Sequence, residues 1–198
     1  MNLETTVTRI LQAAAALFVA KNYADVTVSQ IADSAGVTKG ALYHHFRSKE
    51  ELYLAMMHAE LEEKRLLFSE AVAPKASCPE RLGHLLRAFL KLPRDQREVM
   101  RLVRRDINIF RAHARADLIV AYQAALPMVA ERVIQDGIHD GELAAGDARL
   151  LSWQFVALAE VALSRYADSR FTNADQRVAF VLDLFFHGAA AQHGVAIS

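Results

Sequence analysis

The sequence predicts an all-α protein with about nine helices. Apolar residues recur at helical spacing along most of the chain, and the alternating β-branched runs typical of strands are absent. The four prolines and eight glycines fall mostly between the periodic segments, where turns are expected. With 198 residues and 53% hydrophobic content, the chain is long enough to bury a sizeable core. We therefore expect a three-helix N-terminal head followed by a larger helical body.

The first helix is expected over residues 5–21. Its apolar residues form one stripe: Ile10, Ala13, Ala14, Leu17 and Phe18. Residues 22–25 then form a turn. We interpret this helix as core packing for the head.

A short second helix is expected to begin after Thr27, whose side chain can cap it. Gln30 lies three residues further on and can complete a capping box. The helix should end at Gly36, because glycine tolerates a left-handed backbone. One face of it is apolar: Ile31, Ala32 and Ala35.

Thr38 can cap a third helix with two distinct faces. Leu42 and Phe46 lie one turn apart and are expected to face inward. The opposite face carries Lys39, Gly40, Tyr43 and His44. Residues 48–51, Ser-Lys-Glu-Glu, form another capping box that opens a longer helix. This pattern is typical of a helix-turn-helix whose second helix is free to enter a DNA major groove.

The segment Thr38-Lys-Gly-Ala-Leu-Tyr-His-His-Phe-Arg-Ser-Lys-Glu-Glu-Leu52 resembles the recognition-helix signature of the TetR family of bacterial transcriptional regulators. Residues 28–37 fit the same pattern, and the resemblance covers residues 5–60. Beyond them only size and all-helical character match. The resemblance implies a DNA-binding head and a body that binds an effector and dimerises.

Charge and cysteine content set further bounds. The net charge is zero, from 23 basic and 23 acidic residues, so the overall basic character of many nucleic-acid-binding domains is missing. DNA binding must therefore depend on the local placement of Lys39, Arg47 and Lys49. The single cysteine, Cys78, excludes an internal disulfide and fits a reducing cytoplasm. No apolar run reaches the roughly 18 residues of a membrane span, and the N-terminus lacks a signal-peptide layout, so we expect a cytoplasmic protein.

The helix opened by Ser48 should run to about residue 72 and link head to body. We accordingly expect a DNA-binding domain over residues 1–50 and a ligand-binding and dimerisation domain over residues 51–198. A loop over residues 73–79 contains two prolines and small residues. The next helix is expected over residues 80–92, ended by Pro93.

A helix over residues 94–112 is predicted to have two contrasting faces. One is apolar: Val99, Leu102, Val103, Ile107 and Phe110. The other is polar and rich in arginine: Arg97, Arg101, Arg104, Arg105, Asn108 and Arg111. Two interpretations stay open. The polar face is solvated, or some of its arginines border a pocket and hold an anionic effector, since guanidinium suits carboxylate and phosphate.

The candidate pocket residues combine this helix with apolar neighbours: Phe89, Arg101, Val103, Arg104, Ile107, Phe110, Tyr122 and Met128. Each apolar member fits plain core packing equally well. If they line a pocket, we expect a largely apolar effector with an anionic group, such as an acyl thioester of coenzyme A or a fatty or aromatic acid.

The remaining helices are expected over residues 116–136, kinked at Pro127, and over residues 148–166 and 175–191, with Asp147 capping the first of these two. The last two are apolar over more than one face. In the TetR family such helices pair with their symmetry mates as a four-helix dimer interface. The candidate interface residues are Leu151, Phe155, Leu158, Ala162, Val178, Val181, Leu182 and Phe185.

Catalytic and metal sites are not indicated. His44 and His45 are adjacent and diverge by about 100° on a helix, so they cannot chelate one metal. The sequence has no glycine-rich phosphate loop, no Gly-x-Ser-x-Gly elbow and no defensible nucleophile pair. We expect no enzyme activity, no metal and no cofactor.

Two hypotheses from different classes remain. The chain is a ligand-responsive repressor that binds a palindromic operator as a homodimer, or it is a helical binding or interaction module with a non-functional helix-turn-helix. The intact exposed polar set favours the repressor. Lys39 is expected to read a guanine, with Gly40 close to thymine methyls, and His45 to support the helix from its inner side. The other expected DNA contacts, mainly to phosphates, are Thr27, Ser29, Thr38, Tyr43, His44 and Lys49.

Overall fold

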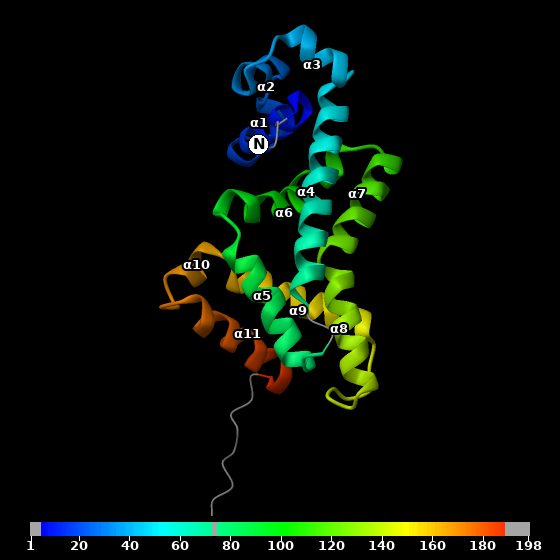
Figure 1. Ribbon diagram of the computed structural model, residues 1–198, viewed down its shortest axis with the longest axis vertical. Helices are drawn as coiled ribbons and strands as arrows, with labels where there is room; N and C mark the ends of the chain where they lie inside the picture. The colour runs from blue at the N-terminus through cyan, green and yellow to red at the C-terminus, as the bar shows by residue number, and fades with distance from the viewer. Residues whose placement is uncertain (1–4, 73–74, 189–198) are drawn as a thin grey trace, which may run out of the picture. The chain divides into compact units, whose positions relative to one another are not determined.

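The computed structural model describes residues 5–72 and 75–188. All regular elements in these ranges are helical, which confirms the all-α prediction. Figure 1 shows the helices in chain order: α1 Thr6–Ala20, α2 Val28–Ala35, α3 Lys39–His45, α4 Lys49–Ala71, α5 Cys78–Lys91, α6 Arg94–Asp106, α7 Ala112–Ala125, α8 Pro127–His139, α9 Ala148–Ala162, α10 Arg165–Asp168 and α11 Ala174–His187. Two short 3-10 helices, η1 (Tyr23–Asp25) and η2 (Ile107–Ile109), lie between them.

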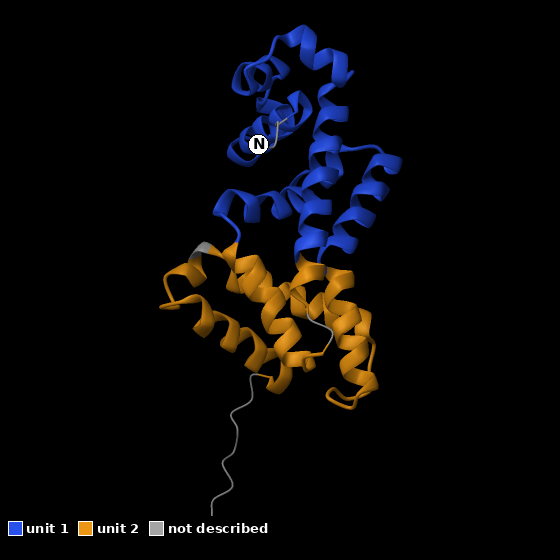
Figure 2. Cartoon of the chain, in the orientation of Figure 1, with its two compact units in different colours: residues 1–67, 92–126 blue, residues 68–91, 127–198 orange. Residues whose placement is uncertain are grey.

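The chain divides into two compact units, coloured separately in Figure 2. Unit 1 comprises residues 1–67 and 92–126, and unit 2 comprises residues 68–91 and 127–198. The division falls within helix α4, between residues 67 and 68. The predicted functional domains, residues 1–50 and 51–198, are a different division and stay a prediction.

Unit 1 is built on α1, which packs against both α2 and α6. Its buried side chains include the predicted stripe members Ile10, Ala13, Ala14 and Phe18. Helix α2 in turn packs on α3, and α6 packs on α7. Helices α1 to α3 therefore share one core with α6.

The helix ends in this unit follow local sequence signals. The Thr27 hydroxyl accepts from the Gln30 N–H at 3.2 Å, and the Gln30 side chain accepts from the Thr27 N–H at 2.9 Å, which is the predicted capping box. Gly36 has φ +65°, the left-handed conformation that favours glycine. At Ser48 the box is displaced by one residue, because the Glu51 carboxylate accepts from the Arg47 N–H instead of the Ser48 N–H.

Two predicted helices have different bounds in the structure. The helix predicted over 94–112 ends at Asp106 and continues only as the 3-10 turn η2. The helix predicted over 116–136 is two helices rather than one kinked helix. Leu126 leaves helical geometry at φ −131° and ψ −54°, and Pro127 is the first residue of α8. Proline favours that first position because its missing N–H needs no partner there.

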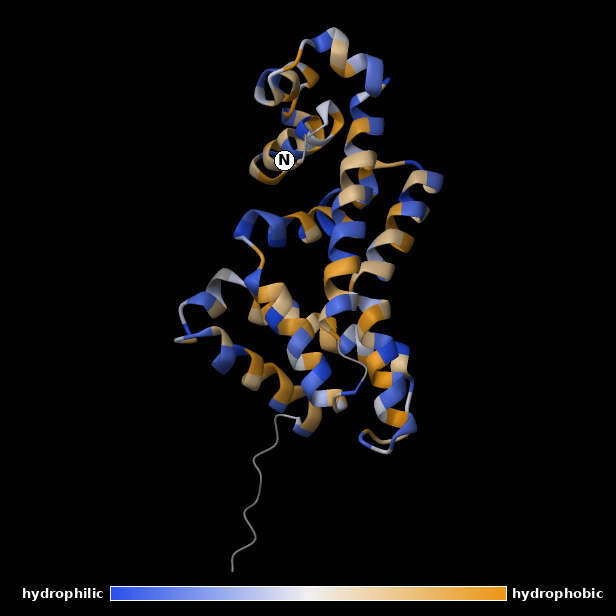
Figure 3. Cartoon of the chain, in the orientation of Figure 1, coloured by the Kyte–Doolittle hydropathy of each residue, from blue (hydrophilic) through white to orange (hydrophobic). Residues whose placement is uncertain are grey.

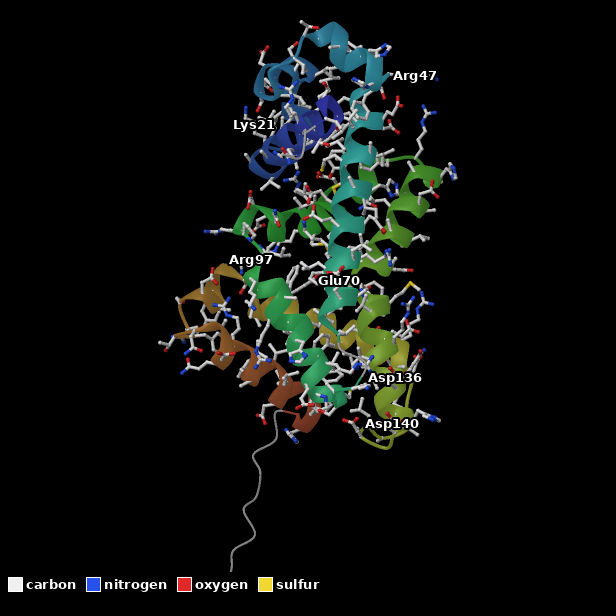
Figure 4. The ribbon with its side chains drawn as sticks, viewed as in Figure 1. Lys21, Arg47, Glu70, Arg97, Asp136 and Asp140 are labelled. Carbon is white, nitrogen blue, oxygen red and sulfur yellow. The ribbon has the colours of Figure 1, made fainter. Side chains whose placement is uncertain are left out.

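Unit 2 contains α5 and α8 to α11. Helix α8 packs on α5 and α9, and α11 packs on the same two helices. Gly137 allows α8 to approach α5 closely, since a Cβ there would lie 2.7 Å from the Cys78 Cβ. At the same contact Arg81 donates to Asp136, labelled in Figure 4, at 2.7 Å. Of the last two helices predicted, α9 ends at Ala162 rather than 166, and residues 189–191 lie outside the described range.

Apolar and polar residues are interspersed along the helices of both units (Figure 3). Among the described residues, no helix combines the length and apolar character needed to cross a membrane.

Candidate nucleic-acid interface

Helix α3 has one buried and one exposed face, as predicted. Leu42 is fully buried and Phe46 is 7% exposed, so both belong to the core. The Thr38 hydroxyl starts the helix by accepting from the Ala41 N–H at 3.1 Å. These contacts orient the opposite face toward solvent.

The exposed face of α3 carries Lys39, Gly40, Tyr43 and His44. The Lys39 ammonium lies 5.9 Å from the centroid of the Tyr43 ring, within cation–π range, so the two side chains lie next to each other. A Cβ added at Gly40 would meet only the Thr38 hydroxyl, at 3.9 Å. The fold therefore does not require glycine at this position, and the backbone is open to close approach.

Thr27 and Ser29 are exposed at the start of α2, and Thr38 is exposed at the start of α3. The two threonine hydroxyls act as acceptors in their helix caps. Each hydroxyl retains its own proton, which it can donate to a phosphate oxygen.

Lys49, a predicted phosphate contact, makes internal contacts that the sequence did not predict. Its ammonium donates to the backbone carbonyls of Tyr23 at 2.8 Å and Val26 at 3.0 Å, and lies 4.3 Å from the Tyr23 ring centroid. Lys49 thus ties the start of α4 to η1. The sequence does not reveal this contact, because the partners are backbone carbonyls more than twenty residues away.

The last residue of α3 differs from expectation, whereas Arg47 does not. His45 was expected to support the helix from its inner side, but it is exposed, since Leu42 and Phe46 occupy the inner positions. Arg47 follows directly after α3 and its side chain is exposed (labelled in Figure 4). It adds a positive charge beside the exposed face of α3.

The candidate ligand residues fall in both units. In unit 1, Val103, Phe110 and Tyr122 are buried, and Arg101 is exposed and pairs with Glu98 at 3.0 Å. Arg104 is exposed, and Ile107 lies in η2. In unit 2, the Phe89 ring packs at 5.5 Å from that of Phe68, and Met128 is 41% exposed.

An apolar hollow of about 380 Å³ lies in unit 2 between α9, α10 and α11. Its lining includes Leu158, Val161, Tyr166, Phe171, Phe180 and Leu184. Val161 and Tyr166 are 71% and 70% exposed, and Phe180 is 53% exposed. None of the eight candidate ligand residues lines this hollow.

Several predicted dimer residues are buried in the core of unit 2. Phe155, Ala162, Val178 and Val181 are buried there, and the Phe155 ring packs 5.4 Å from that of Phe185. Leu151, Leu158, Leu182 and Phe185 are half-buried. The apolar side chains that α9 and α11 expose most are instead Leu150, Val161 and Phe180.

Metal and thiol chemistry find no support in the part of the chain that the structure describes. No group of three or more histidine, cysteine, aspartate or glutamate side chains there is placed to hold a metal ion. Cys78 is buried, and burial raises the pKa of its thiol to about 11, so the thiolate is scarce near neutral pH.

Residues 10–56 match the family model described as "Bacterial regulatory proteins, tetR family". The transcriptional activator FasR of Mycolicibacterium smegmatis is 29% identical over 150 residues, covering 76% of this chain and 67% of FasR. The transcriptional repressor KstR2 of Mycobacterium tuberculosis is 38% identical over 79 residues, and this match covers only 40% of each chain.

Solved structures agree in fold. The regulator FadR from Bacillus subtilis, in complex with stearoyl-CoA, superposes with a TM-score of 0.78 at 20% identity, covering 92% of this chain and 98% of FadR. A regulatory protein of the tetR family from Rhodococcus RHA1 has a TM-score of 0.78 at 21% identity, covering 93% of this chain and 96% of that one.

Proposed function

Because the chain belongs to the TetR family of bacterial regulatory proteins, we propose that it is a cytoplasmic, homodimeric repressor released from a palindromic operator by a small-molecule effector. The observation that carries this proposal is the two-sided α3, which buries Leu42 and Phe46 and exposes Lys39, Tyr43 and His44. Each chain presents one such helix, so two chains related by a two-fold axis would address two half-sites.

In the proposed complex Lys39 reads a base edge, because an ammonium at the start of α3 suits guanine O6 and N7. Gly40 lets the backbone approach thymine methyls. Thr27, Ser29, Thr38 and Tyr43 hold phosphates, and His44 serves either role. Lys49 is left out of this set, since its ammonium is occupied by two backbone carbonyls.

Selection of random-sequence duplexes by the wild-type protein tests DNA binding directly. We expect enrichment of a palindrome, and a promoter carrying it should be repressed in a reporter strain. Failure to enrich any sequence would favour the alternative, a helical module with a non-functional helix-turn-helix. Stimulation of the reporter would make the protein an activator.

We place the proposed dimer contact on the outward faces of α9 and α11. Three large apolar side chains gather there in exposed positions, which a monomer in water does not favour: Leu150, Val161 and Phe180. Val161→Glu and Phe180→Glu should give folded monomers in light scattering, because an unpaired charge in an apolar interface is costly. Gln135→Glu, an exposed position on α8, serves as the matched charge control. A dimer undisturbed by both substitutions would contradict the placement.

We propose an effector that is largely apolar with an anionic group. The support comes from α6, where Arg97 is half-buried and its Nε has no hydrogen-bond partner in the described part of the chain. The fold is also shared with a regulator that binds stearoyl-CoA. Guanidinium groups suit carboxylates and phosphates as binding partners.

Release of the selected operator should be measured against acyl-CoA thioesters, free fatty and aromatic acids, and neutral or cationic hydrophobes. Arg101→Ala and Arg104→Ala should weaken the response more at low than at high salt, since exposed charge contacts are screened. Release by neutral or cationic compounds alone would contradict an anionic effector.

A further inference from the structure

Arg105 lies on the last turn of α6 but reaches the end of α1. Its Nη2 donates to the backbone carbonyl of Phe18 at 2.9 Å and to that of Lys21, labelled in Figure 4, at 3.3 Å. The last carbonyls of a helix lack partners within the helix and carry partial negative charge. The Arg105 guanidinium thus caps the C-terminal end of α1.

Asp106 holds this guanidinium in place through two parallel bonds. Arg105 Nε donates to Asp106 Oδ1 and Nη2 to Oδ2, both at 2.8 Å. Such a forked pair fixes direction as well as distance. The pairing also raises the pKa of Arg105 above its usual value.

Tyr53 on α4 also binds the Asp106 carboxylate. Its hydroxyl donates to Asp106 Oδ2 at 2.8 Å, and both side chains are buried, at 0% and 3% exposure. Burial and this hydrogen bond raise the pKa of Tyr53 far above its usual range, so the hydroxyl keeps its proton. The buried carboxylate is therefore bonded on both oxygens by α4 and α6.

An aromatic cluster surrounds these bonds on the side of α1 and η1. The Tyr53 ring lies 4.8 Å from that of Phe18, 5.2 Å from that of Tyr23 and 5.1 Å from that of Phe110. One turn before Tyr53, Lys49 binds the carbonyls of Tyr23 and Val26. The segment from the end of α1 to the start of α2 is thus bound by side chains of both α4 and α6.

We propose that Tyr53, Asp106 and Arg105 form a latch in which Arg105 is a positioning residue, holding the DNA-binding helices α1 to α3 in a defined place relative to α6. The latch rests on the proposed function only in the claim that α3 binds an operator. Its geometry lies wholly within unit 1. A displacement of α6 would pull directly on α1, on which α2 packs, and α3 packs on α2.

Two spin labels test, without DNA, whether the latch holds α1 to α3 in place relative to α6. Asp33→Cys on α2 and Ala116→Cys on α7 are exposed sites in unit 1. Cys78 is 1% exposed with a raised pKa, so labelling favours the introduced thiols. Pulsed electron paramagnetic resonance, with an excess of unlabelled protein, reports the distance distribution within one chain.

The informative variant is Arg105→Ala with Asp106→Asn. The asparagine still accepts the Tyr53 hydroxyl and leaves no unpaired buried charge, so the tie to α1 is what is lost. We expect a shifted or clearly broader distance distribution. Asp106→Asn alone removes the forked pair but keeps Arg105, so we expect it to broaden the distribution less than the double variant does. Arg94→Ala, at an exposed arginine at the start of α6, should retain the parent distribution. An unchanged distribution in the double variant would overturn the latch.

Arg105→Lys keeps a positive charge beside Asp106. It replaces the double variant in the spin-label test if the double variant does not fold. An ammonium cannot reproduce the planar fork that spans the carboxylate and the Phe18 carbonyl, so we expect partial broadening. A parent-like distribution here would equally overturn the latch.

The second readout is affinity for the duplex selected by the wild-type protein. We expect a loss on the order of tenfold for the double variant, within the usual range of coupling between sites. If no duplex is ever selected, the proposed function fails while the spin-label result still decides the latch. Parent-like affinity with a broadened distribution would overturn the positioning role in DNA binding.

Discussion

Helix α3 and the pair α9 and α11 contrast in what they leave on the surface. Helix α3 buries Leu42 and Phe46 and exposes polar side chains with one open glycine. Helices α9 and α11 bury Phe155, Val178 and Val181, and still expose Val161 and Phe180. A polar exposed face suits a charged partner such as DNA, whereas an apolar exposed face suits another protein surface.

The sharpest test of this contrast compares the two faces of α9. Phe155→Ala removes a ring that is 1% exposed and should lower the free energy of unfolding by about 3–5 kcal/mol in urea denaturation. Val161→Ala, on the outer face at 71% exposure, should change the stability of the isolated chain by about 0.5 kcal/mol or less. Equal losses would show that α9 does not have one buried and one free face. A charge at Phe155 is for the same reason a poor probe of dimerisation.

Lys49 and Lys39 offer a second comparison, between a lysine bound internally and one that is exposed. Lys49→Met removes two hydrogen bonds from a charged donor and should lower the free energy of unfolding by about 1.5–3 kcal/mol. The salt dependence of operator binding should stay unchanged, since no phosphate contact is lost. Lys39→Met is the matched control and should leave stability nearly unaltered. If operator binding by Lys49→Met depends less steeply on salt concentration, Lys49 contacts a phosphate after all.

Base reading by Lys39 predicts a loss that depends on sequence. Lys39→Ala should weaken operator binding by about 1–3 kcal/mol and relax discrimination at one base pair in each half-site. Anisotropy titrations with single-base operator variants measure both effects. Lys91→Ala, on α5 in unit 2, provides the control for general loss of positive charge. A uniform loss on all duplexes would make Lys39 a phosphate contact.

Substitution of Gly40 should raise the stability of the fold rather than lower it. Gly40→Ala places its Cβ in ordinary contact with the Thr38 hydroxyl, at 3.9 Å, and replaces a weak helix former, so unfolding should become up to about 1 kcal/mol less favourable. Operator affinity should nevertheless fall if the backbone approaches the bases here. Gly137→Ala is the contrasting glycine, because its Cβ would meet Cys78 at 2.7 Å and destabilise the fold. Undiminished operator binding by Gly40→Ala would remove the close approach from the proposal.

The helix-turn-helix was predictable from sequence because its signals are local. Thr27, Thr38 and Asp147 each cap a helix through a backbone N–H two or three residues away, and Gly36 ends a helix by its own conformation. The exposed face of α3 follows from helical periodicity alone. The positions of these helices and their exposed side chains agree with prediction.

Other contacts could not be predicted from the sequence, because distant segments supply the partners. The arginines of residues 94–112 read as one polar face, but Arg105 turns to carbonyls more than eighty residues earlier in the chain. Lys49 reads as a phosphate contact, and its partners lie 26 and 23 residues away. Several apolar positions of α9 and α11 were expected at a dimer contact. The structure shows which of them the core of unit 2 already fills, Phe155 among them.

The sequence by itself determined the all-α fold, most helix ends and the composition of the exposed recognition face, because capping and periodicity act within a few residues. Only the tertiary structure decided which charged side chains bind within the chain and which apolar faces stay exposed to solvent. Those outcomes depend on carbonyls and ring faces that a side chain meets only after distant segments have packed. The buried contact of Tyr53 with Asp106, 53 residues apart, is the clearest instance.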